Sequence, residues 1–254
     1  MPAYEHTYLK INEQIRLHLV MVGPADGKPA LLLHGFPEFW YGWRKQALAL
    51  AGKGYRVIIP DQRGYNLSSA PHEVSAYTLE HLSRDVIAIL DHFSIEKVLL
   101  AGHDWGAAVA WTVAILYPER VEKLAILNVP HPAVMMSTLS KSLRQMLKSW
   151  YIGFFQIPGL ADWLMKLNNF AGVLTMLKAS GNPGTFSAED LAEYRKAYTN
   201  SGGLTGMINW YRALARFRPG LPRDVRIKMP ALILWGKKDV ALSYEMAEAS
   251  LAYC

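Results

Sequence analysis

The stretch Gly102-His103-Asp104-Trp105-Gly106 decides how the rest of this sequence is interpreted. Apolar runs precede it at residues 97–101 and follow it at residues 107–111. A strand, a tight turn and a helix in this order are typical of a nucleophile elbow, where small residues flank a central nucleophile because the turn leaves little room. Asp104 occupies the centre. Alone, the pentapeptide is equally compatible with an aspartate that only caps a helix N-terminus.

An aspartate in this position favours attack on a saturated carbon. A serine would form an ether there, which water cleaves poorly, whereas a carboxylate forms an ester whose carbonyl water can attack. Asp104 therefore predicts two-step covalent catalysis on a substrate such as an epoxide or a haloalkane.

Strand and helix patterns alternate on both sides of the elbow. The chain opens with two alternating segments, residues 7–11 and 16–22, that predict an antiparallel hairpin. Buried strands are then expected at 30–33, 55–59, 97–101 and 123–127, and helices at 44–53, 78–93 and 105–117. This order predicts an α/β fold with a mostly parallel sheet.

The alternation stops after residue 132 and resumes at the apolar segment 231–234. The intervening chain is mostly helical, and Ser187 with Asp190 predicts a capping box at the start of one helix. An all-helical insertion between two parallel strands predicts a cap. We therefore expect a core of residues 1–132 and 227–254, and a helical cap of residues 133–226.

Composition excludes several classes of protein. With 254 residues, 51% of them hydrophobic, the chain can bury the core of one large α/β domain. The net charge is +6, and no nucleic-acid motif accompanies the basic residues, so we expect no nucleic-acid partner. The densest basic stretch predicts a solvated surface and comprises Arg212, Arg216, Arg218, Arg223, Arg226 and Lys228.

The same evidence bears on location and cofactors. No apolar run approaches the about 20 residues that span a bilayer, and the first residues lack a signal-peptide core, so we expect a cytoplasmic protein without a membrane span. The sequence does not indicate an oligomeric state. Cys254 is the only cysteine, and neither residues 23–28 nor Gly52-Lys53-Gly54 has the context of a phosphate or dinucleotide loop. We expect no metal and no cofactor.

The strand at 30–33 ends in His34-Gly35-Phe36-Pro37-Glu38. In an α/β-hydrolase arrangement this loop lies beside the elbow, and the backbone N–H groups of Phe36 and Trp105 would form the oxyanion hole. His34, Pro37 and Trp105 are expected to line the substrate pocket. Taken alone, the loop is also compatible with an ordinary turn after a strand.

Together these motifs resemble the epoxide hydrolases of the α/β-hydrolase superfamily. The resemblance rests on residues 34–40, on Asp61-Gln62-Arg63-Gly64-Tyr65, on the elbow and on the helical insertion, and it covers nearly the whole chain. It implies an α/β-hydrolase core with an inserted cap. It also implies that water opens a small hydrophobic epoxide to a vicinal diol through an ester on Asp104, without a cofactor.

The resemblance implies roles for three further side chains. Tyr151 and Tyr211 match two cap tyrosines that hydrogen-bond to the epoxide oxygen, a task that suits a phenol with a pKa of about 10 because it donates a proton yet stays protonated at neutral pH. Asp239, after the strand at 231–234, matches the acid of the catalytic triad. Without the resemblance, ordinary packing of the two tyrosines and an ordinary turn at Asp239 account for these residues better than a catalytic role.

The histidine of that triad is expected downstream of Asp239, but all eight histidines lie at or before His131. The chain stops at Cys254, inside an expected helix that starts near Ser243. The resemblance implies one more strand, a histidine loop and a last helix. We therefore expect a sequence truncated at its C-terminus that hydrolyses the ester poorly. His103 flanks the nucleophile, but we expect it to point away from the site.

Two other functions stay open. The first is a dehalogenase on the same fold. Haloalkane dehalogenases carry Asn after the first His-Gly, where this chain has Phe36, and dehalogenases of the haloacid fluoroacetate carry Arg after the nucleophile, where it has Trp105. The second is a non-catalytic small-molecule binding protein, which fits the missing histidine but needs neither a nucleophile nor paired phenols.

Overall fold

The computed structural model describes residues 3–200 and 204–254, and one sheet forms its centre. The seven strands lie in the order β1-β2-β4-β3-β5-β6-β7. The contacts β1–β2 and β2–β4 are antiparallel, and the other pairs are parallel, which confirms the predicted hairpin and mostly parallel sheet. The strand bounds are β1 Glu5–Lys10, β2 Arg16–Val22, β3 Lys28–Leu33, β4 Tyr55–Pro60, β5 Val98–His103, β6 Val121–Leu127 and β7 Ala231–Leu234.

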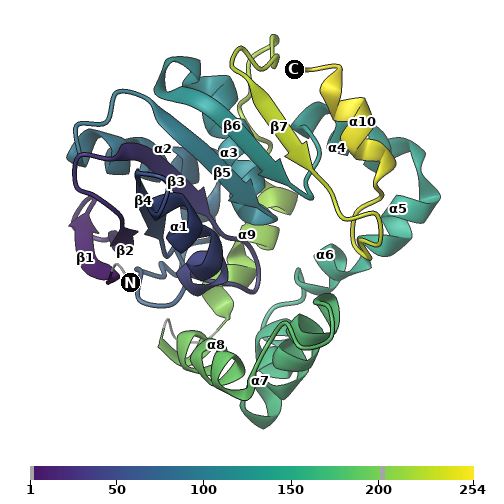
Figure 1. Cartoon of the computed structure of the whole chain (residues 1–254). Coiled ribbons are helices and arrows are strands. Elements are labelled where there is room, and N and C mark those ends of the chain that lie inside the picture. Colours follow the sequence, from purple (N-terminus) through teal and green to yellow (C-terminus); the bar gives the residue numbers. More distant parts are fainter. Residues whose placement is uncertain (1–2, 201–203) are drawn as a thin grey trace.

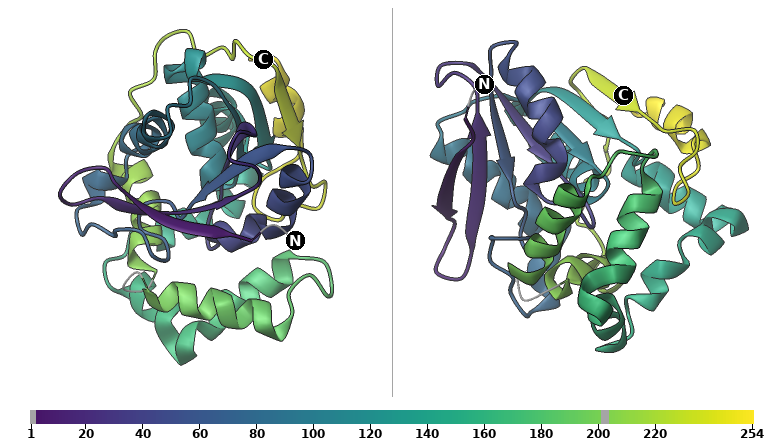
Figure 2. Two further views of the ribbon diagram at one scale, coloured as in Figure 1. Left: turned by 60° about the vertical axis from the view of Figure 1, so that its left-hand side comes forward. Right: turned by 60° about the horizontal axis from the view of Figure 1, so that its bottom comes forward.

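Helices cover both faces of the sheet (Figures 1 and 2). Leu31 and Leu33 of β3 pack with α2 (Leu79–His92) and α3 (Trp105–Leu116). Ala30 and Leu32 face the opposite way, toward α1 (Arg44–Ala51). A strand that is buried on both faces needs apolar residues at every position, which explains the continuous apolar run of β3.

Between β6 and β7 the described residues form helices and no strand. We call this segment the helical insertion, and it comprises α4 Pro132–Lys141, α5 Leu143–Lys148, α6 Trp150–Phe154, α7 Leu160–Ser180, α8 Ala188–Asn200 and α9 Thr205–Arg216. A last helix, α10 Glu245–Leu251, follows β7 and packs beside α4 (Figure 1). The division into a core of 1–132 and 227–254 and a cap of 133–226 stays a prediction.

The helical insertion is tied to the loops at the carboxyl ends of the strands. Ser187 and Asp190 form the predicted capping box of α8 through bonds of 2.9 and 3.1 Å. Asp190 also accepts from Tyr41 Oη at 3.0 Å and from Arg44 Nη2 at 2.7 Å. These bonds hold α8 against the short 3-10 helix η1 (Trp40–Trp43) and against α1.

A second attachment of the helical insertion runs through α9, where Trp210 Nε1 donates to the carbonyl of Arg63 at 2.9 Å.

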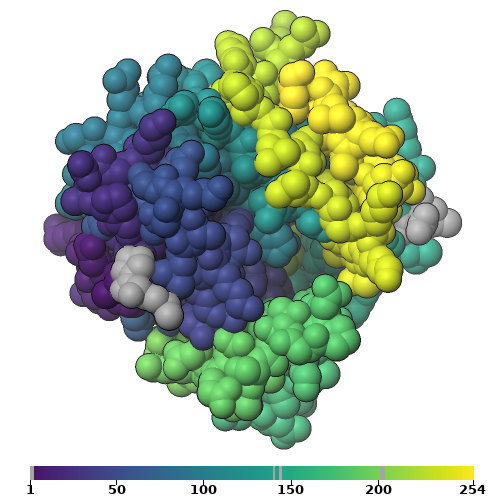
Figure 3. Space-filling view, viewed as in Figure 1, coloured from purple at the N-terminus to yellow at the C-terminus, as the bar shows by residue number. Residues whose placement is uncertain are grey.

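The molecular surface is hollowed between the blue segment around α1, the yellow C-terminal segment and the green helices of the insertion (Figure 3). Figure 1 shows the ends of β5 and β6 directed toward this hollow.

One surface prediction is wrong. Arg212 was expected in a solvated basic stretch, but its side chain is buried and donates to Asp162 at 2.6 Å and to the carbonyl of Phe155 at 3.0 Å. Its position on the inner face of α9, next to Tyr211, explains this burial. In the part of the chain that the structure describes, none of the helices has the length and apolar character that a bilayer crossing needs.

Candidate active site

A strained turn joins β5 to α3 and presents Asp104. The residue has φ 51° and ψ −125°, a conformation that costs energy for a residue with a Cβ and that is found mostly at functional sites. The flanking positions 102 and 106 require glycine because neither has room for a Cβ atom. A Cβ on Gly102 would collide with the backbone of Gly106, and a Cβ on Gly106 would collide with the backbone of Leu33. These contacts are those of the predicted elbow.

Two backbone N–H groups act on the Asp104 carboxylate. The N–H of Phe36 donates to Asp104 Oδ1 at 2.7 Å, and the N–H of the adjacent Trp105 favours the charged form of the carboxylate. Burial raises the pKa of Asp104, while the two N–H groups and the nearby His103 act in the opposite direction and leave the pKa above its ordinary value. Gly35 makes the approach possible, because a Cβ there would overlap the carboxylate.

Tyr151 of α6 and Tyr211 of α9 lie together near this carboxylate. Their rings are 5.8 Å apart between centroids, and the Tyr211 ring lies 4.9 Å from Trp105 and 5.5 Å from Phe36. Burial and the charge of Asp104 raise the pKa of both phenols, so both stay protonated at neutral pH. The structure thus gathers the two predicted tyrosines and both predicted oxyanion residues around one carboxylate.

Asp239 follows β7 and belongs to the same neighbourhood, since its charge acts on Tyr151. Its Oδ1 accepts the N–H groups of Ala241 and Leu242, each at 2.8 Å, and its Oδ2 accepts from Asn128 Nδ2. Three donors therefore fix the carboxylate at the end of β7. Asn128 terminates the neighbouring strand β6, which is why the two residues meet.

The three residues predicted to line the substrate pocket differ in their burial and contacts. His34 does not line a pocket, because its side chain has no exposed surface and both ring nitrogens serve the backbone. His34 Nε2 accepts from the N–H of Gln62 at 3.0 Å, and Nδ1 lies 3.3 Å from the carbonyl of Gly35. These contacts let His34 hold the loop after β3 in place. Pro37 is buried as well, and Trp105 contacts Tyr211 with its ring.

Sequence reasoning considered His103 only as a neighbour that points away from the site, and it did not predict that this side chain pairs with Glu38. His103 Nδ1 lies 3.4 Å from Glu38 Oε2, and the two side chains are 39% and 20% exposed. Tyr194 of α8 donates to the other carboxylate oxygen, Glu38 Oε1, at 3.1 Å. Both Glu38 and His103 stand inside the motifs that predicted the site. Only the folded chain shows that they meet.

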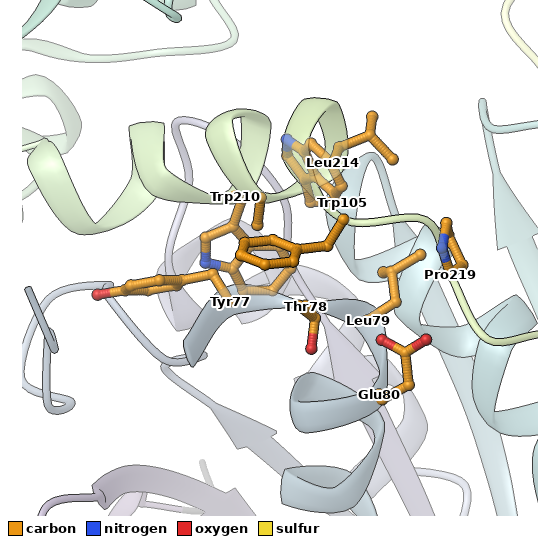
Figure 4. A pocket seen from close by; sticks show the side chains of 10 residues that line it. Tyr77, Thr78, Leu79, Glu80, Trp105, Trp210, Leu214 and Pro219 are labelled. Carbon is orange, nitrogen blue, oxygen red and sulfur yellow. The ribbon is translucent and has the colours of Figure 1, made fainter. Parts of the chain in front are cut away.

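A small pocket lies on another side of Trp105 (Figure 4). Trp105 and Trp210 form part of its wall, with Tyr77, Leu79 and Leu214 around them. Its volume is about 10 Å³, which is the space of about one water molecule. Neither Asp104 nor Tyr151 lines it, so it is not the place where an organic substrate meets the nucleophile. Among the described residues no cluster of His, Cys, Asp and Glu could hold a metal ion.

Comparisons with known proteins agree with this architecture. The alpha/beta hydrolase fold family matches residues 28–252. The AB hydrolase superfamily protein YfhM of Bacillus subtilis is 41% identical over 240 residues, which are 94% of this chain and 84% of that protein. Epoxide hydrolase 4 of Homo sapiens is 40% identical over 256 residues, covering 98% of this chain and 69% of that protein.

Solved structures give the same result. A mutant of an epoxide hydrolase from Bacillus megaterium, crystallised with its product, a naphthyloxy-propane-1,2-diol, superposes with a TM-score of 0.88 at 30% identity. The match covers 97% of this chain and 88% of that chain. The chain therefore belongs to the α/β-hydrolase family, and within it to the group whose members are named epoxide hydrolases.

Proposed function

We propose that this chain opens a small hydrophobic epoxide through an ester on Asp104. One observation carries the proposal: the N–H of Phe36 holds the Asp104 carboxylate from one side, while Tyr151 and Tyr211 lie near it from the helical insertion. The diol found as the product in the Bacillus megaterium enzyme supports an epoxide as the substrate class. In this proposal the helical insertion acts as a cap.

In the first step, Asp104 attacks the less hindered epoxide carbon. Because Phe36 holds Oδ1, the other carboxylate oxygen is the one free to attack. A bond forms between that oxygen and carbon, the epoxide C–O bond breaks, and its electron pair goes to the epoxide oxygen. Tyr151 or Tyr211 gives that oxygen a proton. Both phenols are suited to this, because their raised pKa values keep the proton in place until the alkoxide develops.

In the second step, water attacks the carbonyl carbon of the Asp104 ester. The bond from this carbon to the alkyl-bearing oxygen then breaks, and the diol leaves with that oxygen, which takes up a proton that the attacking water loses. The carbonyl oxygen is then Oδ1, which already accepts the N–H of Phe36, so the developing anion forms inside an existing hydrogen-bond site. Asp239 would orient the histidine that activates this water. The 254 residues contain no histidine after His131, so we propose that a polypeptide of these residues forms the ester faster than it hydrolyses it.

The experiment is to incubate the chain with styrene oxide and, separately, with a chloroalkane. The proposal expects a covalent adduct and 1-phenylethane-1,2-diol from the epoxide, with no halide released from the chloroalkane. Halide release without reaction of the epoxide would favour a dehalogenase instead. Thermal stabilisation by the epoxide with no adduct and no diol would favour a binding protein.

A further inference from the structure

The pair Glu38–His103 is a charged cluster beside the nucleophile that the proposed reaction does not use. Glu38 follows β3 in the loop that supplies Phe36, and His103 is the last residue of β5. Their closest atoms, Glu38 Oε2 and His103 Nδ1, are 3.4 Å apart. The pair therefore connects the loop after β3 to the end of β5, next to the turn that presents Asp104.

The position of Glu38 is fixed from several sides. Tyr194 of α8 donates to its Oε1 at 3.1 Å. Its carboxylate lies against Gly42 of η1, where an added Cβ would come within 2.9 Å of Oε1. A side chain at residue 42 would therefore displace the carboxylate from its present position beside His103. This packing makes the pair a built feature and not a chance surface contact.

The two side chains of the pair favour each other's charged forms. Burial opposes ionisation of Glu38, but the hydrogen bond and charge of His103 outweigh burial and lower the pKa of Glu38. Burial likewise disfavours the imidazolium of His103, but Glu38 and then Asp104 raise the pKa of His103 above its ordinary value. This mutual effect favours a carboxylate on Glu38 and an imidazolium on His103.

We propose that Glu38 and His103 are positioning residues that place a compensated positive charge next to Asp104 and so keep the nucleophile in its carboxylate form. This inference rests on the proposed function, in which Asp104 attacks as a carboxylate. Without a positive charge on His103, Asp104 would share its partly buried site with the uncompensated carboxylate of Glu38. Two like charges in such a site disfavour ionisation of one of them.

Other ionisable groups complete the environment. The remaining groups that act on Asp104 or His103 are Asp239 beside His103, His34 below the loop, and the phenols Tyr65, Tyr151 and Tyr211. Burial lowers the pKa of His34, and burial raises the pKa of each of the three phenols. Burial therefore favours the neutral form of each of these four groups, whereas a positive charge on His103 lowers the pKa of Asp104.

The test measures the rate at which Asp104 is alkylated by styrene oxide across pH, by intact mass spectrometry of the quenched chain. His103→Gln keeps a hydrogen-bond donor for Glu38 but removes the positive charge. The midpoint of the pH profile should rise by roughly one unit or more, which makes alkylation about tenfold slower below the midpoint. At alkaline pH the rates of variant and parent should converge.

The double variant Glu38→Gln with His103→Gln separates charge from structure. Removing the second charge relieves the uncompensated carboxylate, so the midpoint should return toward that of the parent chain. Tyr41→Phe is the matched control, because it removes a hydrogen bond between η1 and Asp190 without changing a charge near Asp104. Its midpoint should equal that of the parent.

Three results are informative. A raised midpoint in His103→Gln that the double variant reverses supports the inference. The inference is overturned if the midpoints do not change, or if the midpoint of the double variant rises further than that of His103→Gln. A merely structural role would not let the second substitution restore the midpoint. If the parent chain forms no Asp104 adduct, the proposed function itself fails. Melting temperatures of all variants identify any loss of folding.

Discussion

The backbone N–H of Phe36 donates a hydrogen bond of 2.7 Å to Asp104 Oδ1. Phe36 lies in the loop after β3, and Asp104 lies in the turn after β5. They meet because β3 and β5 are parallel neighbours that end at the same edge of the sheet. In the proposed mechanism, this bond gives the two carboxylate oxygens different tasks. Oδ1 would hold the anion of the second step, and the other oxygen would attack the epoxide.

Replacing the nucleophile should abolish the ester and stabilise the fold. Asp104→Asn removes the attacking oxygen, so treatment with styrene oxide should leave the mass of the chain unchanged. Burial raises the pKa of Asp104 in the folded state, so ionisation destabilises the fold at neutral pH. The melting temperature of Asp104→Asn should therefore exceed that of the parent at pH 7, and this difference should vanish below the pKa of the unfolded aspartate. A lower melting temperature at pH 7 would argue against a buried carboxylate.

The two tyrosines should control the first step. Tyr151→Phe and Tyr211→Phe each remove one proton donor and keep the ring, so each should slow alkylation of Asp104 by roughly 10²–10⁴-fold. Stopped-flow measurement of tryptophan fluorescence, with quenched mass spectrometry as a second readout, measures this rate. If either variant reacts at the parent rate, that phenol is not a donor.

The pH profile of alkylation should have one limb. The rate should rise with pH through the pKa of Asp104, which lies above the ordinary value of 3.8 because of burial. Burial also raises the pKa of Tyr151 and Tyr211 above the ordinary 10.0, so the phenols should still be protonated at pH 9. A decline in rate between pH 7 and pH 9 would be incompatible with these protonated donors.

A buried ion pair should support the helix that carries Tyr211. Asp85 of α2 accepts from Arg63 Nε at 2.9 Å and from Nη2 at 2.6 Å, and the carbonyl of Arg63 accepts from Trp210 of α9. Asp85→Asn leaves the guanidinium without a counter-ion and should cost about 3–5 kcal/mol of unfolding free energy. Urea denaturation measures this. For comparison, Asp91→Asn breaks the exposed pair with Arg120 and should cost at most about 1 kcal/mol.

The elbow should reject even one methyl group. Gly106→Ala places a Cβ against the backbone of Leu33, so it should destabilise the chain by about 1–3 kcal/mol or more. Gly172→Ala is the control, because a Cβ at this position of α7 meets nothing within 4 Å and should stabilise the helix by about 1 kcal/mol. Equal effects of the two substitutions on the urea midpoint would contradict the close approach at Gly106.

Local patterns were enough to predict the sheet and the elbow, because both depend on short-range features. The apolar run of β3 and the two glycines around Asp104 are visible in a few consecutive residues. The strand at 231–234 was predicted with the bounds that the structure shows. The proximity of Tyr151, Tyr211 and Asp104 came from the family resemblance, since no periodicity connects residues so distant in the chain.

Side-chain environments could not be predicted in the same way. His34 and Arg212 are both polar, and whether such residues are buried depends on partners elsewhere in the chain. Gln62 and Gly35 satisfy the ring of His34, and Asp162 satisfies Arg212. The pairing of Glu38 with His103 has the same origin, because it requires the loop after β3 to fold over the end of β5.

The most direct measurement is to locate the covalent bond. The chain is mixed with styrene oxide, quenched in acid within seconds and digested, and the peptides are sequenced by mass spectrometry. One added epoxide, bound as an ester to Asp104 and removed by hydroxylamine, is the expected finding. Diol production with no adduct on Asp104 at any time, or an adduct on another residue that persists in Asp104→Asn, would show that Asp104 is not the nucleophile.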